Sequence, residues 1–144
     1  MPKNRVVMIY PYQGFSGTLV KHAPLSLLYA SSELVKNGYD VKILDTRAIK
    51  GDWRPAVKEL IDDETLCVGI SVMSGSPIKH ATSIGRYVKA LKSNVPVIWG
   101  GPHGTFYPDT IVRDEWSCDY VVSGYASETF NQLCGHLKAG TYPS

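Results

Sequence analysis

The sequence contains no apolar run long enough to cross a bilayer and no cysteine cluster of the kind that holds zinc or an iron–sulfur centre. Its three cysteines, Cys67, Cys118 and Cys134, lie far apart, which suits a reducing compartment better than a disulfide framework. The first apolar stretch, 6–10, is too short for a secretory signal. We therefore expect a cytoplasmic protein with no membrane partner.

Charge of a single sign is also missing. The 15 basic residues are dispersed among 13 acidic residues, which leaves a formal net charge of +2. A nucleic-acid surface needs clustered lysine and arginine, so we expect no nucleic-acid partner. The 44% of hydrophobic residues and the length of 144 residues are typical of one globular domain.

Several catalytic and nucleotide-binding motifs are absent as well. The first apolar stretch ends in Tyr10-Pro11-Tyr12, where a phospho-accepting receiver domain would need acidic residues. Gly14 and Gly17 do not have the spacing of a dinucleotide-binding glycine motif, and neither a P-loop nor a G-x-S-x-G nucleophile elbow occurs. No complete set of catalytic groups is visible, which favours a binding role.

What the sequence does contain is a regular alternation of apolar runs and helical periodicities. Continuous apolar runs indicate strands that are covered on both faces, and strand–helix repeats predict parallel strands joined by right-handed crossovers. We predict an α/β fold with a doubly wound, parallel five-stranded sheet in the flavodoxin-like (Rossmann-like) order 2-1-3-4-5. The expected strands are 6–10, 41–45, 66–72, 95–99 and 120–122, and the expected helices lie within 24–38, 55–61, 77–91, around 111–112 and around 130–137.

Some positions within this fold can be predicted individually. The run 66–72 is almost free of polar side chains, so it is expected to be the central strand, with Cys67 as a core residue. Lys42 within 41–45 is typical of a strand at the sheet edge. In the first helix we expect Leu34 and Val35 to share the buried face, and Gly38 to close the helix in a left-handed conformation.

The carboxyl ends of parallel strands lie at one edge of the sheet, and ligands bind there at the point where the winding direction reverses. Gly100 and Gly101 either let a flat or bulky ligand lie against main chain or simply form a tight turn. Ser71 either bonds a backbone carbonyl or donates to a ligand, and Ser127 or Glu128 either caps the last helix or joins the site. The loops at this edge are 11–23, 73–77, 99–106 and 123–128.

Six segments, taken in order, carry a family resemblance: Pro24-Leu25-Ser26-Leu27-Leu28-Tyr29-Ala30, Gly38-Tyr39-Asp40-Val41, Val68-Gly69-Ile70-Ser71-Val72-Met73-Ser74-Gly75, Trp99-Gly100-Gly101-Pro102-His103, Asp119-Tyr120-Val121-Val122-Ser123-Gly124 and Glu128-Thr129-Phe130. Together they resemble the N-terminal cobalamin-binding domain of cobalamin-dependent radical SAM enzymes. The resemblance covers nearly the whole chain. It looks closest to the branch that contains the anaerobic magnesium-protoporphyrin IX monomethyl ester cyclase and radical SAM methyltransferases.

The resemblance implies that the nucleotide tail of cobalamin runs into the crevice beside the central strand. It assigns cofactor-binding residues but no catalytic residue and no metal ligand. The implied residues are Ser71, Met73, Ser74 and Gly75 along the tail channel, Gly100, Gly101 and Pro102 where the tail lies against backbone, and Gly124, Tyr125 and Glu128 on the far side.

The sequence departs from better-known cobalamin proteins at their D-x-H-x-x-G motif. The matching stretch, 11–17, contains neither aspartate nor histidine, so the resemblance implies that dimethylbenzimidazole is displaced from cobalt and that this motif supplies no replacement. His22 and His103 have no partner at metal-ligand spacing, and lone loop histidines are more often solvated. We therefore assign no axial ligand.

The cluster motif C-x-x-x-C-x-x-C is also absent, so an iron–sulfur cluster and S-adenosylmethionine are expected only in an absent catalytic domain. We interpret 1–139 as the cobalamin-binding domain and 140–144 as the start of a linker to a C-terminal radical SAM domain of the same chain, its expected partner. This part alone is expected to be inactive. Two alternatives remain: a structural domain of such an enzyme that binds no cobalamin, and a flavodoxin-like FMN-binding protein.

Overall fold

The computed structural model describes residues 3–11, 25–72, 77–100, 108–122 and 126–141. Within these residues a single parallel sheet has the order β2-β1-β3-β4-β5, which confirms the predicted topology. The most apolar run is the central strand and the run with Lys42 lies at the edge, as expected. The strands are β1 (Arg5–Tyr10), β2 (Asp40–Asp45), β3 (Thr65–Ser71), β4 (Val97–Gly100) and β5 (Tyr120–Val121).

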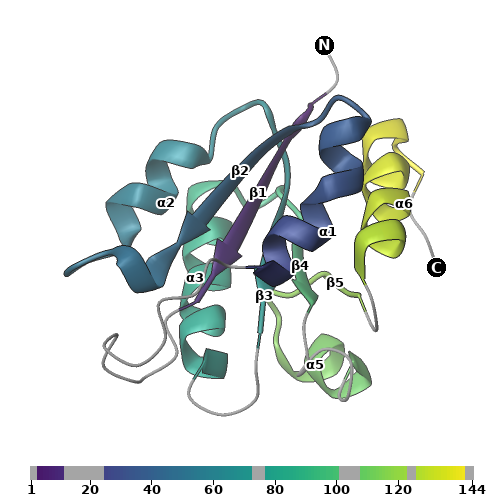
Figure 1. Ribbon diagram of the computed structural model, residues 1–144. Helices are drawn as coiled ribbons and strands as arrows, with labels where there is room; N and C mark the ends of the chain where they lie inside the picture. The colour runs from purple at the N-terminus through teal and green to yellow at the C-terminus, as the bar shows by residue number, and fades with distance from the viewer. Residues whose placement is uncertain (1–2, 12–24, 73–76, 101–107, 123–125, 142–144) are drawn as a thin grey trace.

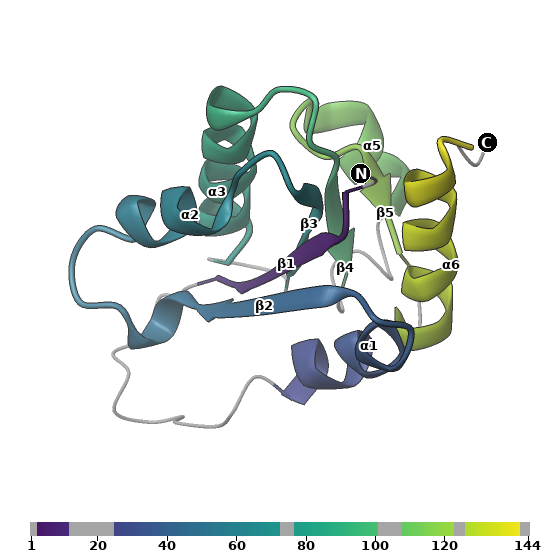
Figure 2. The same cartoon turned by 90° about the horizontal axis from the view of Figure 1, so that it is seen from above.

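Helices cover both faces of the sheet. Figures 1 and 2 show α1 and α6 on one face, here called the α1/α6 face, and α2 and α3 on the other. Of the helices in the described part of the chain, none is both long and apolar enough to span a membrane. The helices are α1 (Leu25–Lys36), η1 (Thr46–Ala48, a 3₁₀ turn), α2 (Arg54–Leu60), α3 (Pro77–Leu91), α5 (Pro108–Asp114) and α6 (Ala126–Ala139).

Each face of the sheet has its own apolar core. Alternation along β3 places Cys67 in the core under α1 and α6, and Val68 in the core under α2 and α3. In α1, Leu34 is fully buried but Val35 is 60% exposed, so the expectation that both share the buried face is wrong for Val35. Successive helical residues are rotated by about 100°, and only the Leu34 side contacts the core. Gly38 ends the helix at φ +84°, as predicted.

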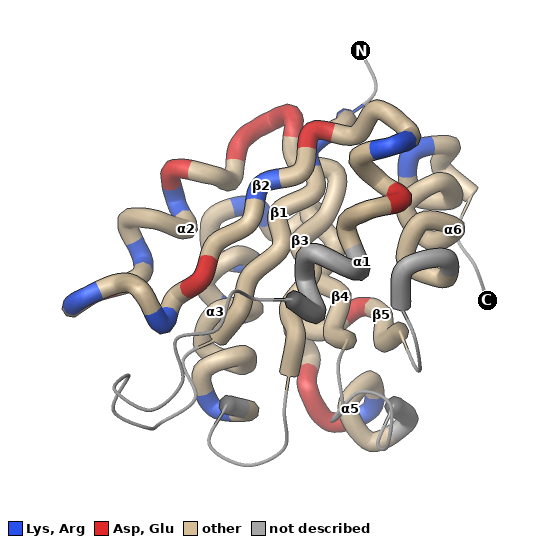
Figure 3. Tube along the Cα trace, viewed as in Figure 1, with Lys and Arg blue, Asp and Glu red and all other residues tan. Residues whose placement is uncertain are grey.

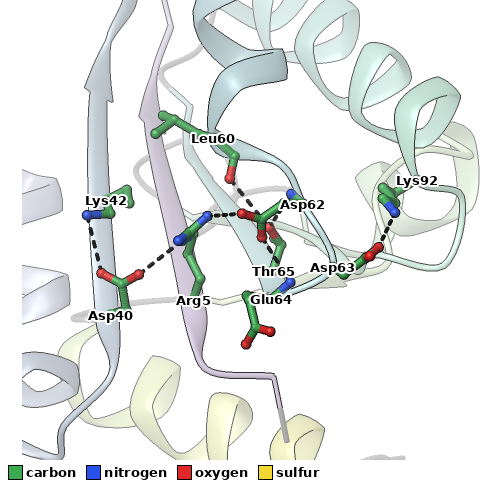
Figure 4. Close-up of polar contacts among 9 residues, drawn as sticks. All are labelled: Arg5, Asp40, Lys42, Leu60, Asp62, Asp63, Glu64, Thr65 and Lys92. Carbon is green, nitrogen blue, oxygen red and sulfur yellow. Dashed lines mark hydrogen bonds and ion pairs between the residues drawn. The ribbon is translucent and has the colours of Figure 1, made fainter. Parts of the chain in front are cut away.

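Ion pairs hold three segments together at the amino edge of the sheet. Arg5 of β1 donates from Nε to Asp40 Oδ2 of β2 at 3.0 Å and from Nη1 to Asp62 in the turn before β3 (Figure 4). Asp40 also pairs with Lys42 at 3.5 Å. The hydrogen bond from Arg5 lowers the pKa of Asp40. Elsewhere on the described elements, basic and acidic residues are interspersed (Figure 3).

The close approach of α3 to the segment before β5 depends on Gly85. A Cβ at Gly85 would lie 2.8 Å from Ser117 Oγ. Ser117 is fully buried and its hydroxyl donates to Glu115, whose carboxylate also accepts a hydrogen bond from Arg86 Nη2 at 2.9 Å. Any shift of Ser117 would therefore disturb a buried polar network.

We predict that Gly85→Ala lowers the free energy of unfolding by about 1 to 3 kcal/mol, because overpacking outweighs the higher helix propensity of alanine. The matched control is Gly135→Ala in α6, where the position is exposed and no described atom lies within 4 Å of the added Cβ. That control should stabilise the chain by about 0.5 to 1 kcal/mol. Urea denaturation followed by circular dichroism measures both, and a stabilising effect of both substitutions would contradict the packing argument.

Candidate functional site

Four strands place neighbouring residues in one row at the carboxyl edge of the sheet. The register pairs Tyr10 with Asp45 and Ser71 with Gly100, and the β1–β3 register, continued by one residue, places Tyr10 beside Ser71. Alternation along each strand puts these positions on the α1/α6 face. We call Asp45, Tyr10, Ser71 and Gly100 the edge row.

The described residues pack less tightly at the Ser71 and Gly100 end of the edge row than deeper in the sheet. Gly69 lies two residues before Ser71 on β3 and on the same face of the sheet. A Cβ at Gly69 would contact Met8 Sδ at 3.0 Å and Phe130 Cζ at 3.1 Å, so α6 packs tightly on the sheet there. At Gly100 the nearest described atom to an added Cβ is a backbone oxygen at 3.9 Å. Among the described residues, the α1/α6 face is thus tightly packed at Gly69 and less tightly packed at Gly100, and we call the position beside Ser71 and Gly100 on this face the slot.

The opposite face is closed at the same edge. Trp99, directly before Gly100, is 1% exposed and belongs to the core under α2 and α3. Among the side chains in the described part of the chain, its Nε1 is the buried polar atom without a hydrogen-bond partner. The bulk of this indole means that the slot lies on the α1/α6 face alone.

A polar cluster that was not expected from the sequence flanks the slot on the β2 side. The guanidinium carbon of Arg47 lies 4.2 Å from the centroid of the Tyr10 ring. Arg47 also donates to both carboxylate oxygens of Asp45, from Nε at 2.9 Å and from Nη2 at 2.8 Å. Thr46 Oγ1 donates to the Tyr10 carbonyl at 2.7 Å. We call these four residues the edge clamp.

The charges of the edge clamp are paired and mostly shielded from water. The Arg47 and Asp45 side chains are 16% and 24% exposed. Burial raises the pKa of Asp45, but hydrogen bonds from the Arg47 side chain and backbone more than offset this, so the pKa lies below its ordinary value. The hydrogen bond to Asp45 raises the pKa of Arg47. The edge clamp therefore contains an intact ion pair at neutral pH.

The buried cysteines do not provide a reactive group. All three are free and buried, which confirms Cys67 as a core residue. The hydrogen bond with Cys134, whose Sγ lies 3.8 Å away, and burial raise the pKa of Cys67 well above its ordinary value. Burial raises the pKa of Cys118 to about 12. The thiols of Cys67 and Cys118 therefore remain protonated at neutral pH and are poor nucleophiles.

Of the predicted cofactor-binding residues, the structure brings together Ser71 and Gly100, on adjacent strands and directly in register. Glu128 lies in the first turn of α6, but its side chain is outside the described part. No group of three metal-ligating side chains occurs in the segments that the structure describes. The predictions that fall outside the described residues are Met73, Ser74, Gly75, Gly101, Pro102, Gly124 and Tyr125, as well as the excluded ligands His22 and His103.

Comparison with known proteins gives three similarities. The B12 binding domain family profile matches residues 18–134. PH0819, an uncharacterised methyltransferase of Pyrococcus horikoshii, is 33% identical over 117 residues, which are 81% of this chain and 25% of that protein. Two structures of TsrM, a radical S-adenosylmethionine methyltransferase of Kitasatospora setae, share the fold at 20% identity.

The first TsrM structure, with tryptophan substrate and a SAM analogue, has a TM-score of 0.81 and covers 96% of this chain and 26% of TsrM. The second, with cobalamin and a [4Fe-4S] cluster, has a TM-score of 0.82 and covers 98% of this chain and 25% of TsrM. The chain thus spans about a quarter of the length of the relatives it matches.

We predict that Asp45→Asn lowers the free energy of unfolding at pH 7 by about 1 to 2 kcal/mol, because hydrogen bonds to a shielded charge are lost. The pKa of Asp45 is lower in the folded than in the unfolded chain, so its carboxylate stabilises the fold at pH values above the unfolded pKa of about 3.9. This stabilisation is lost as the pH falls through the folded pKa. The difference between variant and wild type should therefore shrink from about pH 5 downwards in urea denaturation.

Asp52 is a matched control for this measurement. It accepts hydrogen bonds from the backbone and side chain of Arg54 in the same i, i+2 arrangement, but these side chains are 55% and 54% exposed. Asp52→Asn should change stability by less than about 0.5 kcal/mol. A stability loss in Asp45→Asn that is the same at every pH would contradict the assigned ion pair.

Proposed function

Because the chain belongs to the B12 binding domain family, we propose that it binds cobalamin at the carboxyl edge of its sheet, with the nucleotide tail in the slot. The observation that carries this proposal is the contrast between Gly69, where the α1/α6 face is tightly packed, and Gly100, where an added Cβ meets nothing described closer than 3.9 Å. A long, narrow appendage fits where the packing is less tight. The shared fold of the cobalamin-bound TsrM structure supports cobalamin as the ligand.

In this proposal the residues of the chain bind and orient the cofactor. Ser71 and Gly100 form the floor of the slot, and the remaining contacts come from the other predicted residues, which are 73–75, 101–102, Gly124, Tyr125 and Glu128. When bound, cobalamin would supply methyl transfer or electron transfer to chemistry in a partner domain. The three buried free thiols support a reducing, cytoplasmic setting.

We further propose that 1–139 is the cofactor domain of a longer enzyme and that 140–144 begins the linker to its radical SAM domain, where the iron–sulfur cluster and S-adenosylmethionine would bind. The relatives are about four times as long as the matched region, and both carry the name methyltransferase. Methyl transfer is therefore the proposed reaction class. Oxidative cyclisation of the magnesium-protoporphyrin type rests on the sequence resemblance alone.

The direct test is to titrate the chain with hydroxocobalamin and to record the absorption spectrum after gel filtration. We expect the corrinoid to co-elute with the chain and to show a shifted spectrum. Failure to bind at high cobalamin concentration would contradict the proposal. In that case a parallel titration with FMN would distinguish a flavin-binding protein from a structural domain without cofactor.

We predict that Gly100→Leu weakens cobalamin binding at least about tenfold, equivalent to about 1.4 kcal/mol, because the side chain enters the slot. Gly100→Ala should bind with an intermediate affinity, since its Cβ makes only an ordinary contact at 3.9 Å. Gly135→Leu on the exposed side of α6 is the control and should bind like the wild type. Equal affinity of Gly100→Leu and Gly135→Leu, with both variants folded by circular dichroism, would place the tail elsewhere.

A further inference from the structure

The edge clamp forms the lateral boundary of the slot. In the edge row Ser71 and Gly100 lie beside the slot, and Tyr10 is the first large side chain next to Ser71. Tyr10 also packs against the core of the α1/α6 face, so its ring lies on the side of the sheet where the slot lies. Any group that lies beside Ser71 on this face is therefore next to the Tyr10 ring.

Both the backbone and the ring of Tyr10 are held by neighbouring groups. Thr46 fixes the Tyr10 backbone through its carbonyl, and Arg47 lies over the ring. Arg47 is itself held at three points by Asp45, which accepts from its Nε, Nη2 and backbone amide. A binding wall that is already fixed before the ligand arrives loses less conformational entropy on binding.

A second cluster in the chain has the same residue types as the edge clamp and can be compared with it. Asp52, Trp53 and Arg54 also combine an aspartate, an arginine two residues later and an aromatic ring, with the guanidinium carbon 5.0 Å from the Trp53 centroid. The Asp52 and Arg54 side chains are more than half exposed, and this cluster lies at the start of α2, outside the edge row. Of these two clusters, the edge clamp is the one that combines this chemistry with burial and with a position beside the slot.

We propose that the edge clamp determines specificity for the nucleotide tail of the corrinoid, with the Tyr10 ring in contact with the tail where it passes Ser71. This inference rests on the proposed function and adds to it a wall made by β1 and β2. Aromatic surface beside a heterocycle or a sugar contributes to binding only when that group is present. The edge clamp therefore favours cobalamin over a corrinoid that has the same macrocycle but no nucleotide.

The test compares the affinities of the chain for hydroxocobalamin and for cobinamide, the corrinoid that lacks the nucleotide. In the wild type we expect cobalamin to bind more tightly. Tyr10→Leu should reduce the ratio of the two affinities at least about fivefold by weakening cobalamin alone, and Tyr10→Phe, which keeps the ring, should restore most of it. Arg47→Gln, which removes the cation over the ring, should reduce the ratio in the same direction. Arg54→Gln is the matched control and should leave it unchanged.

The results distinguish the role of the edge clamp from cobalamin binding by the chain as a whole. If the wild type binds cobalamin but neither Tyr10→Leu nor Arg47→Gln changes the ratio, the role of the edge clamp is overturned and the proposed function stands. Equal weakening of both ligands would also overturn it, because that outcome indicates a purely structural role. If the wild type binds neither corrinoid, the proposed function itself fails and this inference fails with it. Thermal melting monitors folding, and Arg47→Gln provides the test if Tyr10→Leu does not fold.

Discussion

The reversal of winding between β1 and β3 is the constraint on which the site depends. The chain leaves β1 for α1 on one face of the sheet and leaves β3 for α3 on the other (Figure 2). Two adjacent strand ends, at Tyr10 and Ser71, are therefore followed by helices on opposite faces of the sheet, the arrangement at which open α/β sheets bind ligands. Because all strands of a parallel sheet end at the same edge, the residues of the edge row lie together at this edge.

Side-chain volume then decides how deep a ligand can reach. Phe130 and Met8 close on Gly69, and Trp99 fills the opposite face, so the described residues bound the slot from below and confine it to the α1/α6 face. In the described part of this edge, the charges of Arg47 and Asp45 are paired with each other. The described part of the site therefore presents small side chains, main chain and an aromatic ring, which is compatible with the proposed ligand.

Much of this architecture could be predicted from the sequence because it depends on local patterns. Uninterrupted apolar runs such as 66–72 identify buried strands, and their alternation with helices fixes a parallel sheet. Ser71 was expected at the site as a hydroxyl inside the apolar central strand, and Gly100 as one of two glycines directly after a strand. Their pairing in register was not predictable, since it depends on how two distant segments align.

The edge clamp could not be derived for the same reason. Asp45 and Arg47 are close in sequence, and their spacing after a strand is a usable signal of an ion pair. The stacking of Arg47 on Tyr10, however, depends on the β1–β2 register. The contact between Gly85 and Ser117 likewise joins two elements whose distance no local pattern encodes.

The ion pairs of Arg5 have a consequence for how such a domain diverges. They join β1, β2 and the turn before β3 at the amino edge, on the side of the sheet away from the slot (Figure 4). Strand alignment is therefore reinforced at the edge of the sheet opposite the edge row. Ion pairs at this edge help the scaffold to persist while most other residues change, in keeping with a relative that shares 20% of its residues and still superposes on 98% of this chain.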